Sequence, residues 1–266
     1  MASKMAALRA SLARQTMEDP EIHARVPLGH GEADACLQGG LRRGALHEIL
    51  AEGSHEAAGA GFAAALSFRL AADKPVLWIR QDFSAAEYGE LAATGLLELG
   101  LDPARLLVLR LADAEEVLRA GWDALSCRAL GAVVIEVQGE PRILDLKASR
   151  RLTLASARKG VTAFLLRFKA ESRAGTAETR WRIRAASSHD KGEDWGFPAF
   201  EAELVRNRQG RTGHWVMEWS CDDGLFREPH GTSAEDSGAM VSPSFHRPAA
   251  SSMESPGGAG AGRRIA

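Results

Sequence analysis

The chain has 266 residues, enough for one substantial core with a small appendage. Apolar residues make up 45% and charged residues 26%, the proportions of an ordinary globular protein. The formal net charge of -2 excludes a strongly basic protein that coats nucleic acid. The sequence has no apolar run long enough to span a bilayer and no secretory signal pattern, so we expect a cytoplasmic protein with no membrane partner.

The cysteines and histidines indicate neither disulfides nor a metal site. Cys36, Cys127 and Cys221 are scattered and odd in number, as expected of free thiols in a reducing compartment. His55 begins a sequence like the zinc motif H-E-x-x-H, but Gly59 stands where the second histidine must be. We therefore predict no bound metal.

The two ends of the chain differ from its middle. Residues 1–26 predict a short helical arm and linker, too short to be stable unless it docks on the core or on a neighbouring molecule. Asp34 is predicted to cap one helical turn through Leu37. Residues 229–266 are rich in Ser, Pro, Gly and Ala, which predicts a disordered tail. The core is expected to span residues 27–228.

Within the core, short apolar runs alternate with helical patterns. The expected buried strands are 45–50, 75–80, 105–111, 132–137 and 162–168. The expected helices are 62–72, 85–99, 114–128 and 142–159, with Asp82 or Ser84 capping the second, Gly100 ending it and Asp113 capping the third. Repeated strand–helix units predict a mostly parallel sheet with helices on both faces. Further strands over 178–188, 200–208 and 214–220 have no helices between them and predict an antiparallel extension.

The first strand is followed by a predicted small-residue loop over 51–61 and then by a helix, the layout of a phosphate-binding loop. In the rule G-x-x-x-x-G-K-[ST], the lysine reaches the phosphates and the hydroxyl binds magnesium. Here the spacing from Gly53 to Gly59 is one residue too long, Ala60 replaces the lysine, and Gly61 replaces the hydroxyl residue.

Glu56 adds a negative charge where a phosphate would lie. A like-charge contact at about 4 Å costs on the order of several kcal/mol, more than the roughly 1 kcal/mol offered by a helix N-terminus. We therefore predict a degenerate nucleotide loop that holds no nucleotide and needs no cofactor. Its residues are Gly53, Ser54, His55, Glu56, Gly59 and Gly61.

Two weaker motifs lie near this loop. Gly59 begins a G-x-G-x-x-A match to the dinucleotide fingerprint, but eight residues separate it from Leu50 at the strand end. Glu136 ends an apolar strand, where an ATPase would place its magnesium-associated acid. The alternative, favoured in the absence of a phosphate-binding lysine, is that Glu136 caps the next segment.

Arginines are concentrated in the C-terminal strands, where they alternate with apolar residues or flank a glycine-bearing turn. They are Arg180, Arg182, Arg184, Arg206, Arg208 and Arg211. Such a face is suited to phosphate or protein contact, but Glu178, Glu201 and Glu203 are interleaved, so a solvated sheet face stays open as the alternative.

Several segments resemble a known family. Asp34-x-x-Leu37 followed by GGLxxGxxxEI over 39–49 is similar to the lead-in to the phosphate loop of RecA/RadA recombinases. A closer resemblance, over residues 25–222, is to the ImuA family of RecA-like, SulA-related proteins. The segments that carry it are 44–49 (GALHEI), 100–107 (GLDPARLL), 179–183 (TRWRI) and 203–211 (ELVRNRQGR).

The resemblance implies a RecA-like α/β fold and a non-catalytic accessory role in SOS-induced, error-prone translesion synthesis. The implied partners are an ImuB-like relative of Y-family polymerases and an error-prone C-family polymerase, with a link to RecA and only indirect contact with DNA. The predicted contact residues are Arg182, Arg206, Asn207, Arg208 and Arg211. The alternatives are an active RecA-like ATPase with an atypical loop and a SulA-like regulator of cell division.

Overall fold

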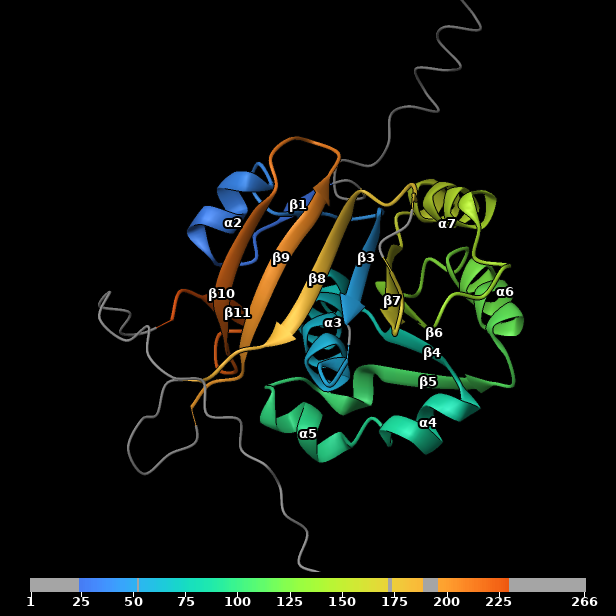
Figure 1. The fold of residues 1–266 in the computed structure, drawn as a ribbon, viewed down its shortest axis with the longest axis horizontal. Helices are drawn as coiled ribbons and strands as arrows, with labels where there is room; N and C mark the ends of the chain where they lie inside the picture. Colours follow the sequence, from blue (N-terminus) through green and yellow to red (C-terminus); the bar gives the residue numbers. More distant parts are fainter. Residues whose placement is uncertain (1–23, 52, 172–173, 189–195, 230–266) are drawn as a thin grey trace, which may run out of the picture. The chain divides into compact units, whose positions relative to one another are not determined.

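The computed structural model describes residues 24–51, 53–171, 174–188 and 196–229, all of which belong to one compact unit (Figure 1). The expected N-terminal arm, apart from residues 24–26, and the expected tail beyond residue 229 lie outside these ranges. No helix among the described residues is both long and apolar enough to cross a membrane.

In the described chain, one large sheet has the strand order β11-β10-β9-β8-β3-β7-β6-β4-β5. Its parallel strands are β3 (Leu46–Ala51), β4 (Val76–Gln81), β5 (Leu106–Leu111), β6 (Ala132–Gln138), β7 (Thr162–Phe168) and β8 (Thr179–Ala185). The antiparallel extension consists of β9 (Ala199–Asn207), β10 (Gly213–Ser220) and β11 (Leu225–Arg227). The fold class is therefore confirmed, with one correction: β8 pairs parallel to β3, so the antiparallel part begins only at the β8–β9 pair.

The central strands β3, β6 and β7 are buried on both faces, as their continuous apolar runs predict. The same prediction is wrong for β5, because it lies at the edge of the sheet, where Leu107, Val108 and Leu109 are 51%, 43% and 38% exposed. α3 (Glu56–Ala71) packs on one face over a core that includes Trp78, Val134 and Phe164. α6 (Ala114–Ala124) and α7 (Leu146–Lys159) pack on the other, over Ile135 and Leu165 (Figure 1). Successive residues of β6 and β7 contribute alternately to these two cores. We call the side of the sheet covered by α3 the α3 face and the opposite side the α6–α7 face.

Helix boundaries follow local chemistry in some places and not in others. Asp113 accepts a hydrogen bond from the amide of Glu116 and caps α6, as predicted. The expected single helix over 85–99 is wrong, because the chain leaves the helical path at Gly89, whose φ is +81°. It forms instead α4 (Asp82–Tyr88) and α5 (Ala93–Glu98).

The predicted caps of these two helices have mixed outcomes. Gln81 occupies the N-cap position of α4, so neither Asp82 nor Ser84 caps it as predicted. Gly100, with φ +70°, donates to the Leu97 carbonyl immediately after α5, which confirms that it ends this segment. After it come the 3₁₀ turn η1 (Pro103–Arg105), whose N-cap is Asp102, and β5.

The lead-in forms a small second sheet, in which β1 (Arg25–Val26) pairs with β2 (Leu41–Arg42). Between them lies α2 (Gly31–Cys36), whose N-cap is His30. The predicted capping role of Asp34 is therefore wrong. Its carboxylate reaches back to accept hydrogen bonds from the amides of Leu28 (2.6 Å) and Gly29 (2.9 Å), which fixes the turn before the helix.

Candidate functional site

The segment after β3 is shorter than its sequence suggests. α3 begins at Glu56, six residues before the predicted start at residue 62, so the predicted loop over 51–61 is wrong and residues 52–55 alone connect strand and helix. Gly53 (φ +66°) and the exposed Ser54 lie in this short connection, whereas Gly59 and Gly61 are helical. The connection is therefore shorter than the loop of 51–61 that the sequence predicts.

The two helical glycines have different packing roles. A Cβ on Gly59 would lie 2.5 Å from the Cβ of Ala51, so glycine is required for α3 to approach the end of β3 this closely. A Cβ on Gly61 would meet the Phe200 ring at 3.6 Å, an ordinary contact. The glycine pattern that resembles a nucleotide loop is thus explained at Gly59 by packing of helix on strand.

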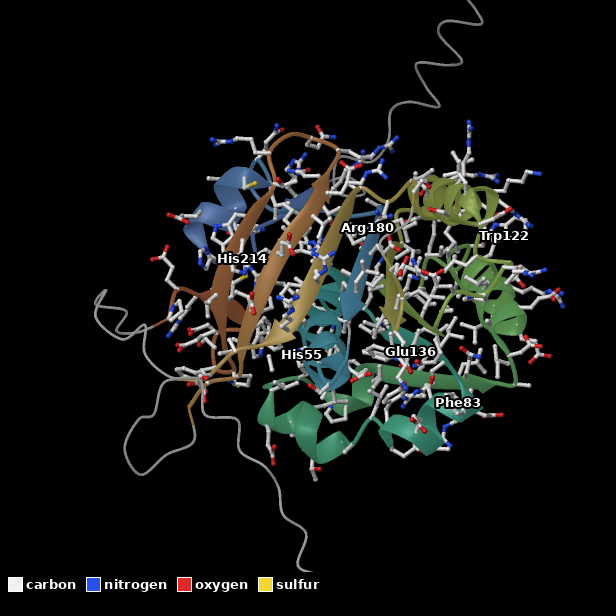
Figure 2. The ribbon with its side chains drawn as sticks, in the orientation of Figure 1. His55, Phe83, Trp122, Glu136, Arg180 and His214 are labelled. Atoms are coloured by element: carbon white, nitrogen blue, oxygen red, sulfur yellow. The ribbon has the colours of Figure 1, made fainter. Side chains whose placement is uncertain are left out.

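The two polar side chains at the start of α3, Glu56 and His55, interact within the protein. Glu56 lies in the first turn, where a carboxylate interacts favourably with the helix dipole. His55 accepts a hydrogen bond through Nδ1 from the amide of Ala185 (3.2 Å), which ties the connection to the end of β8 (Figure 2).

Lys169, just beyond β7, lies near the start of α3. The sequence did not predict this cation there. It pairs with Glu87 at 3.7 Å. Tyr88 first, and then Glu87 and Glu56, raise the pKa of the Lys169 ammonium group above its ordinary value. The cation therefore has acidic neighbours of its own.

Glu136 lies within the sheet at the same edge, on β6, and is only 1% exposed (Figure 2). Its carboxylate accepts hydrogen bonds from Trp78 Nε1 (2.7 Å) and from the guanidinium of Arg80 (3.1 Å), both on β4. Arg80 also donates to the carbonyl of Gly89. The carboxylate of Glu136 therefore does not cap the next segment, and it is not free to bind magnesium, because it forms an ion pair with the buried Arg80.

A cavity of about 480 Å³ lies beside Glu136, between the start of α3 and the α4–α5 segment. Its described lining contains three acids, Glu56, Glu90 and Glu136, and a single cation, Arg80. Much of the rest is apolar, including Leu91, Leu96 and Phe168. An acid-rich cavity whose lining cation is already paired disfavours a polyphosphate ligand.

No group of three or more His, Cys, Asp or Glu side chains gathers at metal-binding distance in the described part of the chain.

The arginines of β8 are matched by acids across the strands. Arg182 donates to Glu203 on β9 at 2.6 Å, and Arg184 lies 3.6 Å from Glu201. Both pairs are directly opposite in the β8–β9 register. The predicted basic face is therefore a ladder of cross-strand ion pairs over this part of the sheet.

The β9–β10 hairpin separates the remaining predicted contact residues into two kinds. Arg206 donates to the carbonyl of Gly175. Asn207 donates to the carbonyls of Cys36 (3.1 Å) and Arg211 (3.0 Å), which joins the hairpin to the end of α2. Arg208 and Arg211, by contrast, have exposed side chains at the turn.

One cluster was missed from the sequence. Glu48 on β3 accepts from Arg180 (2.6 Å) on β8 and from Arg167 (3.1 Å) on β7, and all three side chains are buried. Figure 2 shows Arg180 toward the opposite end of β8 from His55. The sequence did contain one indication of this cluster. Glu48 lies in the middle of a strand that was expected to be buried on both faces, and a buried carboxylate requires a nearby cation.

The fold and the site together define an α/β protein with a mostly parallel sheet, in which residues 52–55 connect β3 to α3 and Glu136 is paired with Arg80 nearby. Two curated relatives, both named Protein ImuA and from two strains of Caulobacter vibrioides (NA1000 / CB15N and ATCC 19089 / CIP 103742 / CB 15), are each 34% identical to it over 208 residues. The match covers 71% of this chain and 81% of each relative. No family model matches the chain. The chain belongs to the ImuA family.

Proposed function

We propose that this protein is a non-catalytic, RecA-like accessory component of damage-induced, error-prone translesion DNA synthesis. It acts in the cytoplasm as a scaffold for an ImuB-like relative of Y-family polymerases and an error-prone C-family polymerase, is linked to RecA, and contacts DNA indirectly. Membership of the ImuA family supports the pathway.

One structural observation supports the non-catalytic role. The connection between β3 and α3 is reduced to residues 52–55, and beside it the carboxylate of Glu136 is paired with Arg80. Phosphoryl transfer depends on positioned cations and backbone donors around the phosphates. A sheet without that machinery retains its outer surfaces, which remain available to partner proteins.

The test is co-expression of this chain with the ImuB-like protein and the C-family polymerase encoded in the same genome, followed by affinity purification and gel filtration. We expect the three proteins to elute together. Separate elution of all three well-folded proteins would reject the scaffold.

Within that complex, the exposed Arg208 and Arg211 at the β9–β10 turn are the contact residues that substitution tests most cleanly. Charge reversal at both, Arg208→Glu with Arg211→Glu, is expected to weaken the partner contact at least tenfold. Arg206 and Asn207 are unsuitable for this purpose, because their side chains hold the hairpin itself. Unchanged binding by the folded double variant would reject the site and leave the scaffold intact.

The cavity beside Glu136 keeps a RecA-like ATPase with an atypical loop as the second candidate, because its volume of about 480 Å³ would accommodate a ligand of substantial size. Titration calorimetry with ATP and Mg²⁺ distinguishes the two. We expect no heat of binding, and an affinity in the micromolar range would favour the ATPase.

A further inference from the structure

The outer surface of α6 and α7 combines exposed apolar side chains with cations in a way that the site above does not explain. α7 carries five cations among 14 residues and no Asp or Glu, although the whole chain has a net charge of -2. The cations are Lys147, Arg150, Arg151, Arg158 and Lys159.

These charges are not used in ion pairs within the described chain. The acids of the same surface are occupied elsewhere, since Glu115 pairs with Arg119 on its own helix and Asp145 caps α7 through the amide of Ala148. The helix dipole accounts for cations in the last turn, but not for Lys147, which lies in the first turn where a positive charge is unfavourable. Five cations of α7 therefore have no acid within ion-pair distance among the described residues. They are Lys147, Arg150, Arg151, Arg158 and Lys159.

Two cavities lie side by side between the helices. The first, of about 380 Å³, is lined by Leu118, Ile143 and Leu152 among others, and the second, of about 330 Å³, by Leu154 and Ala155 with Arg158 and Lys159. They share two side chains, Trp122 of α6 and Arg151 of α7. We call the two cavities together the α6–α7 groove.

Trp122 and Arg151 form the partition of this groove. The guanidinium carbon of Arg151 lies 3.4 Å from the centre of the Trp122 ring, a cation–π contact that holds both side chains in place. Trp122 nevertheless remains 38% exposed, and Figure 2 shows it at the α6–α7 surface. Ile143 in the first cavity is 42% exposed and Leu154 in the second is 54% exposed, so each cavity presents apolar surface to solvent.

We propose that the α6–α7 groove binds an acidic amphipathic helix of a partner protein. Its apolar side chains fill the two cavities on either side of Trp122, and its carboxylates meet Arg151, Arg158 and Lys159. Two features of the groove favour this partner. The cations of α7 have no acid partner among the described residues and so attract carboxylates, and the aliphatic lining of the cavities suits apolar side chains. This is the arrangement by which amphipathic helices are recognised in grooves.

Nucleic acid fits the same surface less well. Single strands bind through bases stacked on open aromatic faces, and here Arg151 already covers one face of the aromatic side chain. Glu115 lines the groove, and Glu116 and Asp123 lie on the same helix, so a continuous phosphate backbone would meet acids as well as cations. A peptide can place its few carboxylates opposite α7 alone.

The inference goes beyond the proposed scaffold role, since it concerns a surface separate from the hairpin turn, and its test uses no polymerase. The probe is a fluorescein-labelled 16-residue helix with Leu at i, i+3, i+4 and i+7 spacing, Glu at a few positions along one side of the Leu stripe, and Ala and Gln elsewhere. A scrambled peptide of identical composition and a labelled dT16 oligonucleotide are the comparison probes. Binding to the full chain is followed by fluorescence anisotropy at physiological salt.

We expect the amphipathic peptide to bind at least tenfold more tightly than the scrambled peptide and than dT16. Trp122→Ala and the double reversal Arg158→Glu with Lys159→Glu are each expected to weaken it about tenfold or more. The matched control is Arg110→Glu with Arg227→Glu, which changes the net charge equally at two exposed cations outside the groove and is expected to leave the affinity unchanged. Circular dichroism and thermal unfolding establish that each variant is folded.

Three results would overturn the proposal. Equal binding of the scrambled peptide, or equal weakening by the control at Arg110 and Arg227, would show attraction by charge alone. Tighter binding of dT16 that is lost in the same variants would assign the groove to nucleic acid. A dimer in sedimentation velocity that Trp122→Ala dissociates would assign it to a second copy of the chain.

Discussion

The two faces of the sheet differ in how their charges and apolar side chains are used. On the α3 face, rings such as Phe62, Trp181 and Phe226 pack together, and the acid Glu136 has its own buried cation. On the α6–α7 face, the layer next to the sheet is equally closed around Glu48, but the outer helices expose Trp122 and a row of cations without acids. Surface that is neither buried nor neutralised is where a partner is expected.

The contrast distinguishes charges that are paired inside the protein from cations that have no acid partner among the described residues. The edge near the start of α3 has the layout of a nucleotide site, but internal packing and ion pairs use its groups. On the α6–α7 surface, Arg151 packs on Trp122, but the cations of α7 have no acid at ion-pair distance among the described residues.

The largest effects are expected from the buried acids, one on each face. Glu136→Gln leaves the buried Arg80 without its counter-ion, and Glu48→Gln does the same to Arg167 and Arg180. Each is expected to lower the free energy of unfolding by about 3–5 kcal/mol, measured by urea denaturation at pH 7. The control is Glu90→Gln, which removes an exposed pair with Arg110 and is expected to cost less than about 1 kcal/mol. Equal costs at the buried and exposed sites would contradict the burial of these clusters.

A pH-dependent loss of stability is expected on the α3 face from His47. Burial first lowers its pKa, from the model-compound value of 6.5 to about 4, against the opposing hydrogen bond to the Arg42 carbonyl. Because the unfolded state binds the proton more readily, stability is complete above about pH 6.5 and falls as the pH drops toward 4. The total loss is about 3 kcal/mol.

Urea denaturation at several pH values measures this effect. His47→Gln is expected to be less stable at pH 7 but to show a flatter dependence between pH 6.5 and 4 than the parent protein. An unchanged slope in His47→Gln would mean that other groups carry the dependence.

A smaller effect compares the two helical glycines of α3. Gly59→Ala places a methyl group 2.5 Å from the Cβ of Ala51 and is expected to cost about 1–3 kcal/mol. Gly61→Ala meets Phe200 at an ordinary distance and is expected to be neutral or to stabilise by up to about 1 kcal/mol through helix propensity. Thermal unfolding of the two variants is the measurement, and equal destabilisation would argue against the packing explanation.

The smallest effect is expected at the ion-pair ladder between β8 and β9. Glu203→Gln removes the partnership with the half-buried Arg182 and is expected to change stability by less than about 1 kcal/mol, because solvent screens the pair. A cost as large as that of Glu136→Gln, in the same urea experiment, would show that this part of the α6–α7 face is as tightly coupled as the core.

The sequence by itself determined five of the sheet's six parallel strands, since continuous apolar runs such as 162–168 can be recognised without tertiary information. It also established that no lysine stands at the loop, which is a matter of residue identity alone. Single helix caps such as Asp113 were readable for the same local reason.

The tertiary structure alone decided the rest. The start of α3 at Glu56 was hidden because the glycines at 59 and 61 weaken the local helical signal, while packing against β3 requires the first of them. The pairings of Glu136 with Arg80, and of Glu48 with Arg167 and Arg180, join residues 56 to 132 positions apart. The Trp122–Arg151 partition joins two helices in the same way. Which charges find partners, and which are left for another molecule, depends on strand order and helix packing, which no local pattern records.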